Sequence, residues 1–297
     1  MRSDGWHLTE DLDEFLARSG DFLRTRPALH TVALTVTETL RVRGMHTYGS
    51  EAPVFGLLRQ AGEVRAAFLR TPPQSLSPTR LTPEQADSLA ARLAALGHRL
   101  PGVNADHDTA TAFAEAWQRH TGATPTLHRR HRLYRLGDLT PAQPLPGGRA
   151  RVAGPQDRRQ LMRWYREFTA AAGIAQSMDA GSWADARIAR AGITFWETPD
   201  GTPVSMAGAT AMVAGQIRVA PVYTPARLRG HGYAGAVTVE VSRAALAAGA
   251  QEVVLFADLA NPTSNGLYGR LGYRPVADFA VYEFPETSAA DVPGRTG

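Results

Sequence analysis

The sequence contains no cysteine and no lysine. Without cysteine it has no disulfide, no thiolate zinc site and no cysteine nucleophile. Without lysine it has neither a Schiff-base nucleophile nor the lysine of a Walker P-loop, and all 32 basic residues are arginine. Covalent catalysis through sulfur or through an ε-amine is therefore excluded.

Long apolar runs are also missing. No stretch approaches the run of about 18 apolar residues that a membrane helix needs. The N-terminal residues Met1–His7 have no apolar core of the kind found in signal peptides. The histidines show none of the His-x-x-x-His or His/Asp spacings that hold metal ions. We therefore expect a cytoplasmic protein with no metal site and no membrane partner.

The remaining composition is typical of a globular protein. Its 297 residues, 43% of them hydrophobic, suffice for one large domain or two ordinary ones. The net charge of +4 permits an anionic ligand without requiring nucleic acid. The basic stretch His128–Arg132 alternates like an edge strand, where outward basic side chains discourage aggregation. We prefer that interpretation to RNA binding and expect no nucleic-acid partner.

A segment rich in proline and glycine interrupts the chain near its middle. Leu139–Gly148 shows neither helical nor strand periodicity and is interpreted as a linker. The prediction is therefore two domains, residues 1–138 and 149–297, joined by a linker at residues 139–148.

The C-terminal half alternates helices with strands. Asp157 can cap a helix with apolar residues at helical spacing, and Ser182 can cap another that runs to Ala191. The whole order, two helices, three strands, helix, strand, helix and strand, indicates an α/β fold with a mixed sheet. Strands are expected at Ile193–Glu197, Pro203–Met212, Ile217–Tyr223, Glu252–Ala257 and Ala277–Phe284, and helices at Gly230–Ala248 and Pro262–Leu271.

The N-terminal half repeats this plan more faintly. Thr31–Thr37 alternates like a strand. Leu69–Pro72 matches Val222–Pro225, and Leu133–Leu136 matches Val281–Phe284, which indicates an internal duplication. Helices are expected around Leu12–Leu16 and at Pro83–Leu96 and Asp108–Arg119, and strands at Val54–Leu58, Val64–Leu69 and Leu127–Leu136.

Two glycines and two arginines occupy a strand-to-helix junction in the C-terminal half. A helix that begins after a glycine-rich turn presents backbone N–H groups at the positive end of its dipole, which favours phosphate. Gly230 and Gly232 let the backbone approach an anion, and Arg227 and Arg229 add positive charge. The junction predicts a pyrophosphate site, although glycines in this position can also simply shape a turn.

A second motif follows one helix and one strand later. Arg227–Gly232, with the pattern R-x-x-G-x-G, resembles the acyl-CoA pyrophosphate loop of the GCN5-related N-acetyltransferases (GNAT). Asn261–Tyr273, with the pattern N-x-x-S-x-x-L-Y-x-x-x-G-Y, resembles the second signature of that superfamily. The specific match covers residues 195–284. Within the superfamily, the chain resembles bacterial two-domain proteins with an N-terminal acetyltransferase-like half.

The resemblance implies tandem acetyltransferase-like domains, the C-terminal one complete and the N-terminal one degenerate, with acetyl-CoA as cosubstrate. The main chain of Val222, Tyr223 and Thr224 would pair with the pantetheine arm, and one N–H would polarise the thioester carbonyl. Tyr268 would donate a proton to the departing thiolate. The other implied cofactor-binding residues are Arg227, Leu228, Arg229, Gly230, His231, Gly232, Tyr233 and Ala234 at the pyrophosphate, and Asn261, Ser264 and Asn265 near the pantetheine.

These roles have structural alternatives. Tyr268 could be a core aromatic side chain, and Asn261 could be the N-cap of a helix beginning at Pro262. The strand Gln216–Tyr223 carries no carboxylate, although many members of the superfamily place a glutamate there. The general base is therefore left open among Glu167, Asp179 and Glu197.

The N-terminal half lacks a comparable phosphate loop. Thr71–Pro73 stands where that loop would begin, but no matching glycines follow, so we expect this half to wall the acceptor site. The predicted function is direct transfer of an acetyl group from acetyl-CoA to a primary amine of a small molecule, by a monomer or homodimer. The alternatives are a CoA-binding regulatory or scaffold protein without turnover, and an N-acetyltransferase that acts on a protein or peptide.

Overall fold

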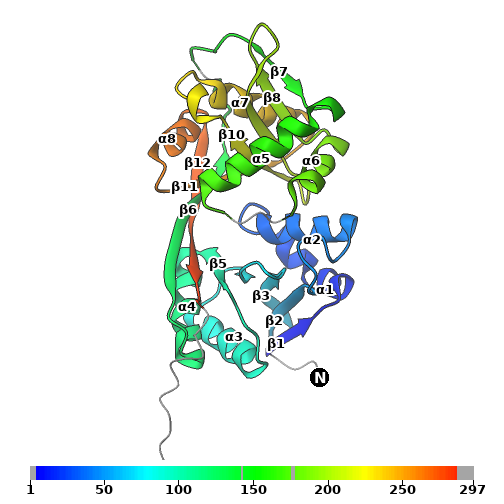
Figure 1. Cartoon of the computed structure of the whole chain (residues 1–297). Helices are drawn as coiled ribbons and strands as arrows, with labels where there is room; N and C mark the ends of the chain where they lie inside the picture. Colours follow the sequence, from blue (N-terminus) through cyan, green and yellow to red (C-terminus); the bar gives the residue numbers. More distant parts are fainter. Residues whose placement is uncertain (1–4, 142, 175–177, 286–297) are drawn as a thin grey trace, which may run out of the picture. The chain divides into compact units, whose positions relative to one another are not determined.

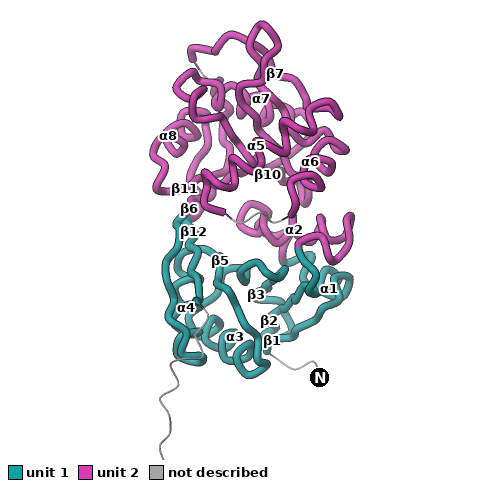
Figure 2. Tube along the Cα trace, in the orientation of Figure 1, with its two compact units in different colours: residues 1–22, 49–130, 278–297 teal, residues 23–48, 131–277 magenta. Residues whose placement is uncertain are grey.

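The structure is a computed structural model that describes residues 5–141, 143–174 and 178–285 (Figure 1). It divides into two compact units (Figure 2). Unit 1 comprises Met1–Phe22, Gly49–Arg130 and Asp278–Gly297, and unit 2 comprises Leu23–Tyr48 and His131–Ala277. Ala142 of the predicted linker and the ends of both predicted domains, residues 1–4 and 286–297, lie outside the described residues.

The two units do not coincide with the two halves of the chain. Leu23–Tyr48 comes from the first half but belongs to unit 2, and Asp278–Gly297 comes from the second half but belongs to unit 1. The last strand, β12 (Tyr273–Glu283), explains the second exchange, because from Phe279 onward it pairs antiparallel with β5 (Gly102–Asp106). The predicted boundaries at residues 138 and 149 stay a prediction, and the compact units are interleaved along the chain.

Unit 1 contains an antiparallel sheet with the strand order β1-β2-β3-β4. Its core joins Phe68 of the sheet to apolar residues of α3 and α4, among them Leu89, Phe113 and Trp117. The elements that begin in this unit, besides β5, are β1 (Gly5–Thr9), α1 (Leu12–Arg24), β2 (Val54–Gln60), β3 (Glu63–Arg70), β4 (Ser77–Pro78), α3 (Pro83–Ala95), α4 (His107–Thr121) and β6 (Thr126–Leu136).

Unit 2 contains a sheet in which the strands follow the order β6-β11-β10-β9-β8-β7. β10 and β11 run parallel, and the other neighbours run antiparallel. The strands that begin here, besides β12, are β7 (Arg149–Val152), β8 (Ile193–Glu197), β9 (Pro203–Ala209), β10 (Gln216–Tyr223) and β11 (Glu252–Asp258). The helices are α2 (Thr31–Arg43), α5 (Arg158–Ala172), α6 (Ala180–Ala189), α7 (Tyr233–Ala247) and α8 (Pro262–Arg270).

Helices pack on both faces of the unit 2 sheet. One buried cluster joins α7 to Ile217 and Val219 of β10, and a second joins α5 and α6 to Phe195 and Met206. Trp164 of α5 is 2% exposed and meets the Phe195 ring edge-on at 5.5 Å. Since successive side chains of a strand point to opposite faces, each residue of β10 is assigned to the α7 face or to the α5/α6 face.

Most of the predicted helices and strands are confirmed, with ends that differ by a few residues. The helix predicted from Gly230 begins only at Tyr233, because Gly230 and Gly232 have φ values of 81° and 80° that a helix does not accept. The short strands β1, β5 and β7 were not predicted, since runs of four or five residues carry little periodicity.

The strand predicted at Thr31–Thr37 is wrong, because this segment is the first half of helix α2. The hydroxyls of Thr35, Thr37 and Thr39 donate to carbonyls four residues earlier, at 2.7 to 2.8 Å. This back-bonding satisfies the threonines within the helix. Burial of Leu34 and Leu40 then outweighs the weak preference of β-branched residues for strands.

The two predicted helix caps differ from the observed ones. Asp157 occupies the N-cap position of α5 as predicted but makes no capping bond, because its carboxylate is held by Arg151 and by the N–H of Gly154. The cap of α6 is Asp179, three residues before the predicted Ser182, and its carboxylate accepts from the N–H groups of Gly181 and Ser182. Those two N–H bonds satisfy donors that the first helical turn leaves free.

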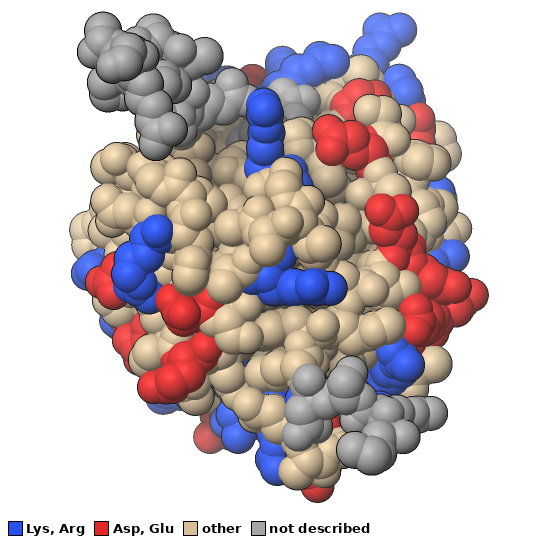
Figure 3. Space-filling model, turned by 90° about the horizontal axis from the view of Figure 1, so that it is seen from below, with Lys and Arg blue, Asp and Glu red and all other residues tan. Residues whose placement is uncertain are grey.

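The basic stretch His128–Arg132 does not lie on an edge strand. The sheet order places β6 between β11 and β12, so the expectation based on alternating charge is wrong. A space-filling view of one face shows acidic and basic side chains interspersed (Figure 3). Among the described helices, none combines the length and the apolar character needed to cross a membrane.

The corrected cap can be tested by comparing two alanine substitutions. Asp179→Ala is expected to lower the free energy of unfolding by about 1 kcal/mol, because two N–H groups of α6 lose their acceptor. Ser182→Ala, at the position predicted from the sequence, is expected to change it by a few tenths of a kcal/mol at most. Urea unfolding followed by circular dichroism measures both, and a larger loss for Ser182→Ala would contradict the assignment.

Candidate functional site

The parallel ladder between β10 and β11 is short. It runs only from the pair Gln216 and Glu252 to the pair Arg218 and Val254. β11 continues to pair with β6 on its other edge as far as Asp258. Within the described residues, the facing edges of β10 and β11 therefore leave their backbone N–H and C=O groups unpaired beyond Arg218. An added extended chain can pair with groups of this kind.

An irregularity in β10 lies directly after the end of this ladder. The register with β9 shifts between Val219 and Val222, and Pro221 has no N–H to contribute. The shift moves the side-chain alternation by one residue. Val219 and Val222 consequently pack on the α7 side, whereas Tyr223 joins the cluster on the α5/α6 side.

The predicted main-chain segment from Val222 to Thr224 lies at this end of β10. Ser205 of β9 holds it, because its hydroxyl donates to the Tyr223 carbonyl at 3.2 Å and shares a hydrogen bond of 2.8 Å with the Thr224 hydroxyl. β9 thus supports the segment on one edge, and the opposite edge is the one that faces β11.

The predicted phosphate loop leads from β10 into α7. A short 3-10 turn at Ala226–Leu228 precedes Gly230 and Gly232, and Gly232 is the N-cap of α7. Among the described residues, the N–H groups of Gly230, His231 and Gly232 have no hydrogen-bond acceptor, and the first N–H groups of α7 have none within the helix. An ideal Cβ on Gly230 would meet nothing within 4 Å. The loop therefore has both donors and room for an anion.

The side chains of the loop divide into two groups. Arg229 and His231 brace the loop itself, since Arg229 Nε donates to Thr224 O at 3.1 Å and His231 Nδ1 donates to Arg229 O at 2.8 Å. The His231 ring also stacks on Tyr233, with centroids 5.5 Å apart. Arg227 is exposed and has no partner within the described chain, so its charge is available to a ligand.

The asparagines of the second motif have structural partners. Asn261 is the N-cap of α8, and its side-chain oxygen accepts from the Ser264 N–H at 3.0 Å. Asn265 donates from Nδ2 to the carbonyls of Asp258 and Asn261, and its oxygen accepts from the Tyr134 hydroxyl at 2.8 Å. Asn265 thus ties α8 to β11 and β6. The side-chain nitrogen of Asn261 has no hydrogen-bond partner in the described chain and can donate to a ligand.

Tyr268 is both a core aromatic side chain and a candidate acid. It is 7% exposed and meets the Tyr273 ring edge-on at 6.0 Å. Its hydroxyl has no hydrogen-bond partner among the described residues, and burial raises the pKa of this phenol above its usual value. The side chain therefore stays protonated near neutral pH and can serve as a proton donor.

The three candidate bases have different surroundings. Glu197 is 3% exposed and accepts from Arg151 Nε at 2.6 Å, which leaves it held as an ion pair. Asp179 caps α6, and its bonds to Ser182 lower its pKa. Glu167 differs from both, because its carboxylate accepts from the Tyr223 hydroxyl at 2.8 Å.

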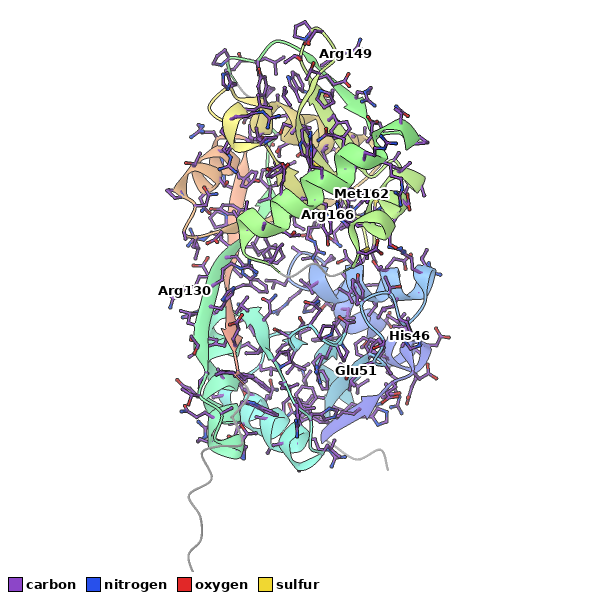
Figure 4. All side chains as sticks on the ribbon, in the orientation of Figure 1. His46, Glu51, Arg130, Arg149, Met162 and Arg166 are labelled. Atoms are coloured by element: carbon purple, nitrogen blue, oxygen red, sulfur yellow. The ribbon has the colours of Figure 1, made fainter. Side chains whose placement is uncertain are left out.

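The contact of Glu167 with Tyr223 brings a carboxylate to the end of β10. Burial, followed by the bond to Glu167, raises the pKa of Tyr223 to about 12. Glu167 lies on α5, the helix marked by Met162 and Arg166 in Figure 4. The sequence predicted Glu167 only as one acid among three and did not predict a role for the Tyr223 side chain. The available signal was the spacing of Glu167 and Trp164 on one helix face.

The strand position nearest the start of the ladder carries an amide. Gln216 is fully buried, its Oε1 accepts from the Thr31 hydroxyl at 2.9 Å, and its Nε2 has no partner within the described ranges. Helix α2 supplies Thr31, so the segment that was predicted to be a strand packs beside β10. No aspartate or glutamate occurs in β10.

No family model matches the sequence, and no curated protein matches it either. Solved structures do match. A GCN5-related N-acetyltransferase from Sphaerobacter thermophilus has a TM-score of 0.62 at 18% identity, over 95% of this chain and 96% of its own. A GNAT-family acetyltransferase from Colwellia psychrerythraea has a TM-score of 0.58 at 12% identity, covering 94% and 99%.

The chain has the fold of the GCN5-related N-acetyltransferases. A third match shows the tandem form: a tandem GNAT protein from the clavulanic acid biosynthesis pathway has a TM-score of 0.58 at 12% identity, over 93% of this chain and 97% of its own. The predicted fold class, a mixed α/β sheet in a tandem GNAT arrangement, is thereby confirmed. Identities this low show the fold alone, and the reaction has to be inferred from the site.

The loop assignment can be tested with two glycines at opposite ends of α7. Gly232→Glu is expected to abolish CoA binding measured by calorimetry, because a carboxylate would occupy the anion-binding end of the helix. Gly249→Glu is the matched control, since Gly249 has a φ of 88° and open space for a side chain. It carries the same backbone strain but lies beyond the other end of the helix. Equal CoA affinity in the two variants would refute the site.

Proposed function

We propose that this chain is an acyl-CoA-dependent N-acetyltransferase that transfers an acetyl group directly from acetyl-CoA to a primary amine of a small molecule. One arrangement carries the proposal. The ladder between β10 and β11 ends at Arg218, and the same strand leads into a loop of free N–H groups at the start of α7. An extended arm and a diphosphate on one ligand match these two features.

The residues present fit coenzyme A as that ligand. The unpaired edge of Val222 to Thr224 suits the amides of pantetheine, and the loop from Arg227 to Ala234 suits the pyrophosphate. Asn261 follows β11, the strand next to β10, and offers a side-chain N–H. When bound, the cosubstrate supplies an activated thioester carbonyl, which a backbone N–H of β10 would polarise.

Tyr268 is the group we assign to protonate the leaving thiolate. Its pKa is raised by burial, so at neutral pH the phenol carries its proton and can donate it. The absence of a hydrogen-bond partner among the described residues leaves the hydroxyl free to meet a ligand.

Glu167 is the group we assign to remove a proton from the acceptor ammonium, through the Tyr223 hydroxyl or directly. It is the one candidate acid that contacts the end of β10, whereas Glu197 and Asp179 are held in other interactions. The amine must lose a proton before its lone pair can attack the thioester. A carboxylate on the α5/α6 face can therefore serve where β10 carries none.

A CoA-binding regulatory protein without turnover is the second candidate. The observation that favours it is the composition of β10, because the strand carries no aspartate or glutamate that could act as a base. Acetylation of a protein or peptide amine is a third candidate function, and the screen of amines described next tests it as well.

The decisive experiment is a screen of amines with acetyl-CoA, followed by detection of free thiol. The protein has no cysteine, so every thiol in the assay comes from released CoA. Acetylation of at least one small amine is expected. CoA binding without thiol release across small amines and peptides would support the regulatory alternative. Absence of CoA binding would exclude both the acetyltransferase and the CoA-binding regulatory protein.

Tyr268→Phe is expected to lower kcat on the order of tenfold to a thousandfold with little change in CoA affinity, since only the hydroxyl and its acidic proton are removed. Tyr282→Phe is the matched control, because the Tyr282 hydroxyl bonds Thr111 within unit 1. An unaltered kcat in Tyr268→Phe would remove this residue from the mechanism.

Glu167→Gln is expected to lower kcat by about a hundredfold to ten-thousandfold at neutral pH. The kcat of this variant is expected to recover at higher pH, because the amine then loses its proton in solution. If Tyr223 relays the proton, the double variant with Tyr223→Phe is expected to be no slower than the slower single variant. Glu240→Gln, an exposed pair with Arg243 on α7, serves as the control. Additive losses in the double variant would argue against a shared path.

A further inference from the structure

Three arginines of unit 2 gather at the end of β9. Arg187 lies in the last turn of α6 and Arg190 is its C-cap. Arg187 Nη1 and Arg190 Nη2 both donate to the carbonyl of Ala209, at 2.6 and 2.9 Å. Arg218 of β10 lies across from the next residue, since its N–H donates to the Thr210 hydroxyl at 2.9 Å. Arg187, Arg190 and Arg218 are called the arginine cluster below.

No carboxylate neutralises this cluster within the described chain. The charged or titratable groups that act on Arg187 are Arg190, Arg218 and two tyrosines, Tyr48 and Tyr165. Arg190 is influenced by Arg43 and Tyr48, and Arg218 by Tyr48. Elsewhere in the same unit, Arg151 lies between Asp157 and Glu197, which raise its pKa. The cluster therefore brings like charges together without the compensation that Arg151 receives.

Such an arrangement has an energetic cost. Burial, and then the two neighbouring arginines, lowers the pKa of Arg187 to about 9, and burial lowers the pKa of Arg218 to about 10. At neutral pH both guanidinium groups stay protonated. Their desolvation and mutual repulsion are offset when an anion binds among them. A guanidinium group can donate two parallel hydrogen bonds to a carboxylate or a phosphate.

A buried amide lies on the same face of β10 as Arg218. Gln216 precedes Arg218 by two residues, so both side chains point to the same face of β10. Its Oε1 accepts from Thr31, whereas its buried Nε2 has no partner among the described residues. An unpaired buried N–H is costly, and a bound anion would accept from it.

The cluster faces the same side of the sheet as the proposed proton acceptor. Ile217 and Val219 pack toward α7, so Arg218 between them points to the α5/α6 face, where Tyr223 meets Glu167. Arg218 and Tyr223 are five positions apart along β10, which places their Cα atoms roughly 16 Å from each other. A long arginine side chain covers part of this span. A ligand that reaches from the cluster to the open edge of β10 must be an extended molecule.

We propose that the arginine cluster binds an anionic group of the acceptor, so that the substrates are primary amines with a carboxylate or phosphate several bonds from the nitrogen. This inference rests on the proposed acetyltransferase function for the amine end of the molecule. The anion-binding property of Arg187, Arg190, Arg218 and Gln216 does not depend on that function.

Matched acceptors test the proposal. We expect kcat/KM for 6-aminohexanoate or 6-aminohexyl phosphate to exceed that for hexylamine by at least tenfold, and the better of the two identifies the anion. Arg187→Gln and Arg218→Gln are expected to raise KM for that acceptor by about tenfold to a hundredfold, with kcat nearly unchanged. Activity on hexylamine is expected to be unaffected. Arg243 on α7 pairs with Glu240, and Arg243→Gln is expected to change neither the KM for the anionic acceptor nor the activity on hexylamine.

A binding measurement without turnover separates this inference from the proposed function. Glutarate and inorganic phosphate are the probes, and at least one is expected to raise Tm of the wild-type protein but not of Arg187→Gln or Arg218→Gln. Equal acetylation of all three amines with no Tm response would overturn the anion site and leave the acetyltransferase proposal standing. If CoA does not bind, the acetyltransferase proposal fails, and the Tm response alone decides whether the cluster binds anions.

Discussion

The site depends on where the parallel ladder between β10 and β11 stops. Three residue pairs hold the strands together, and beyond Arg218 and Val254 their facing edges have no partners in the part of the chain that the structure describes. A polar backbone group that is buried without a partner costs about 1–3 kcal/mol. A sheet keeps such an edge at low cost only if water or an extended ligand pairs with it. The pantetheine amides proposed for this edge are the kind of partner that it lacks.

β10 also connects the two faces of its sheet. The register shift around Pro221 lets Val219 and Val222, three positions apart, both pack toward α7, while Tyr223 packs toward α5. Beyond Tyr223 the chain turns into the loop at the head of α7, while before the shift Arg218 points to the α5/α6 face. β10 thus contributes to each proposed part: its main chain to the cosubstrate site, Tyr223 to the contact with Glu167, and Arg218 to the anion site.

The sequence predicted the parts of this site whose chemistry is local. Gly230 and Gly232 need left-handed φ values and Asn261 caps the helix that starts at Pro262, so each leaves a short motif in the chain. Contacts between distant segments leave no such motif. The bonds of Glu167 to Tyr223 and of Thr31 to Gln216, and the meeting of Arg187 with Arg218, arise only from packing. Helix α2 was mispredicted for the same reason, since burial of Leu34 and Leu40 overrode its alternating pattern.

The exchange of segments between the units affects how the protein is made. Unit 1 needs Phe279–Glu283 to cover the edge of β5, and these residues are translated after all of unit 2. Domains usually fold in order as they leave the ribosome. Here β5 of unit 1 has no partner from β12 until all of unit 2 has been translated. A cut at the linker would separate β5 and β6 from β12 and β11, so the sheet that contains these four strands would be divided between the fragments.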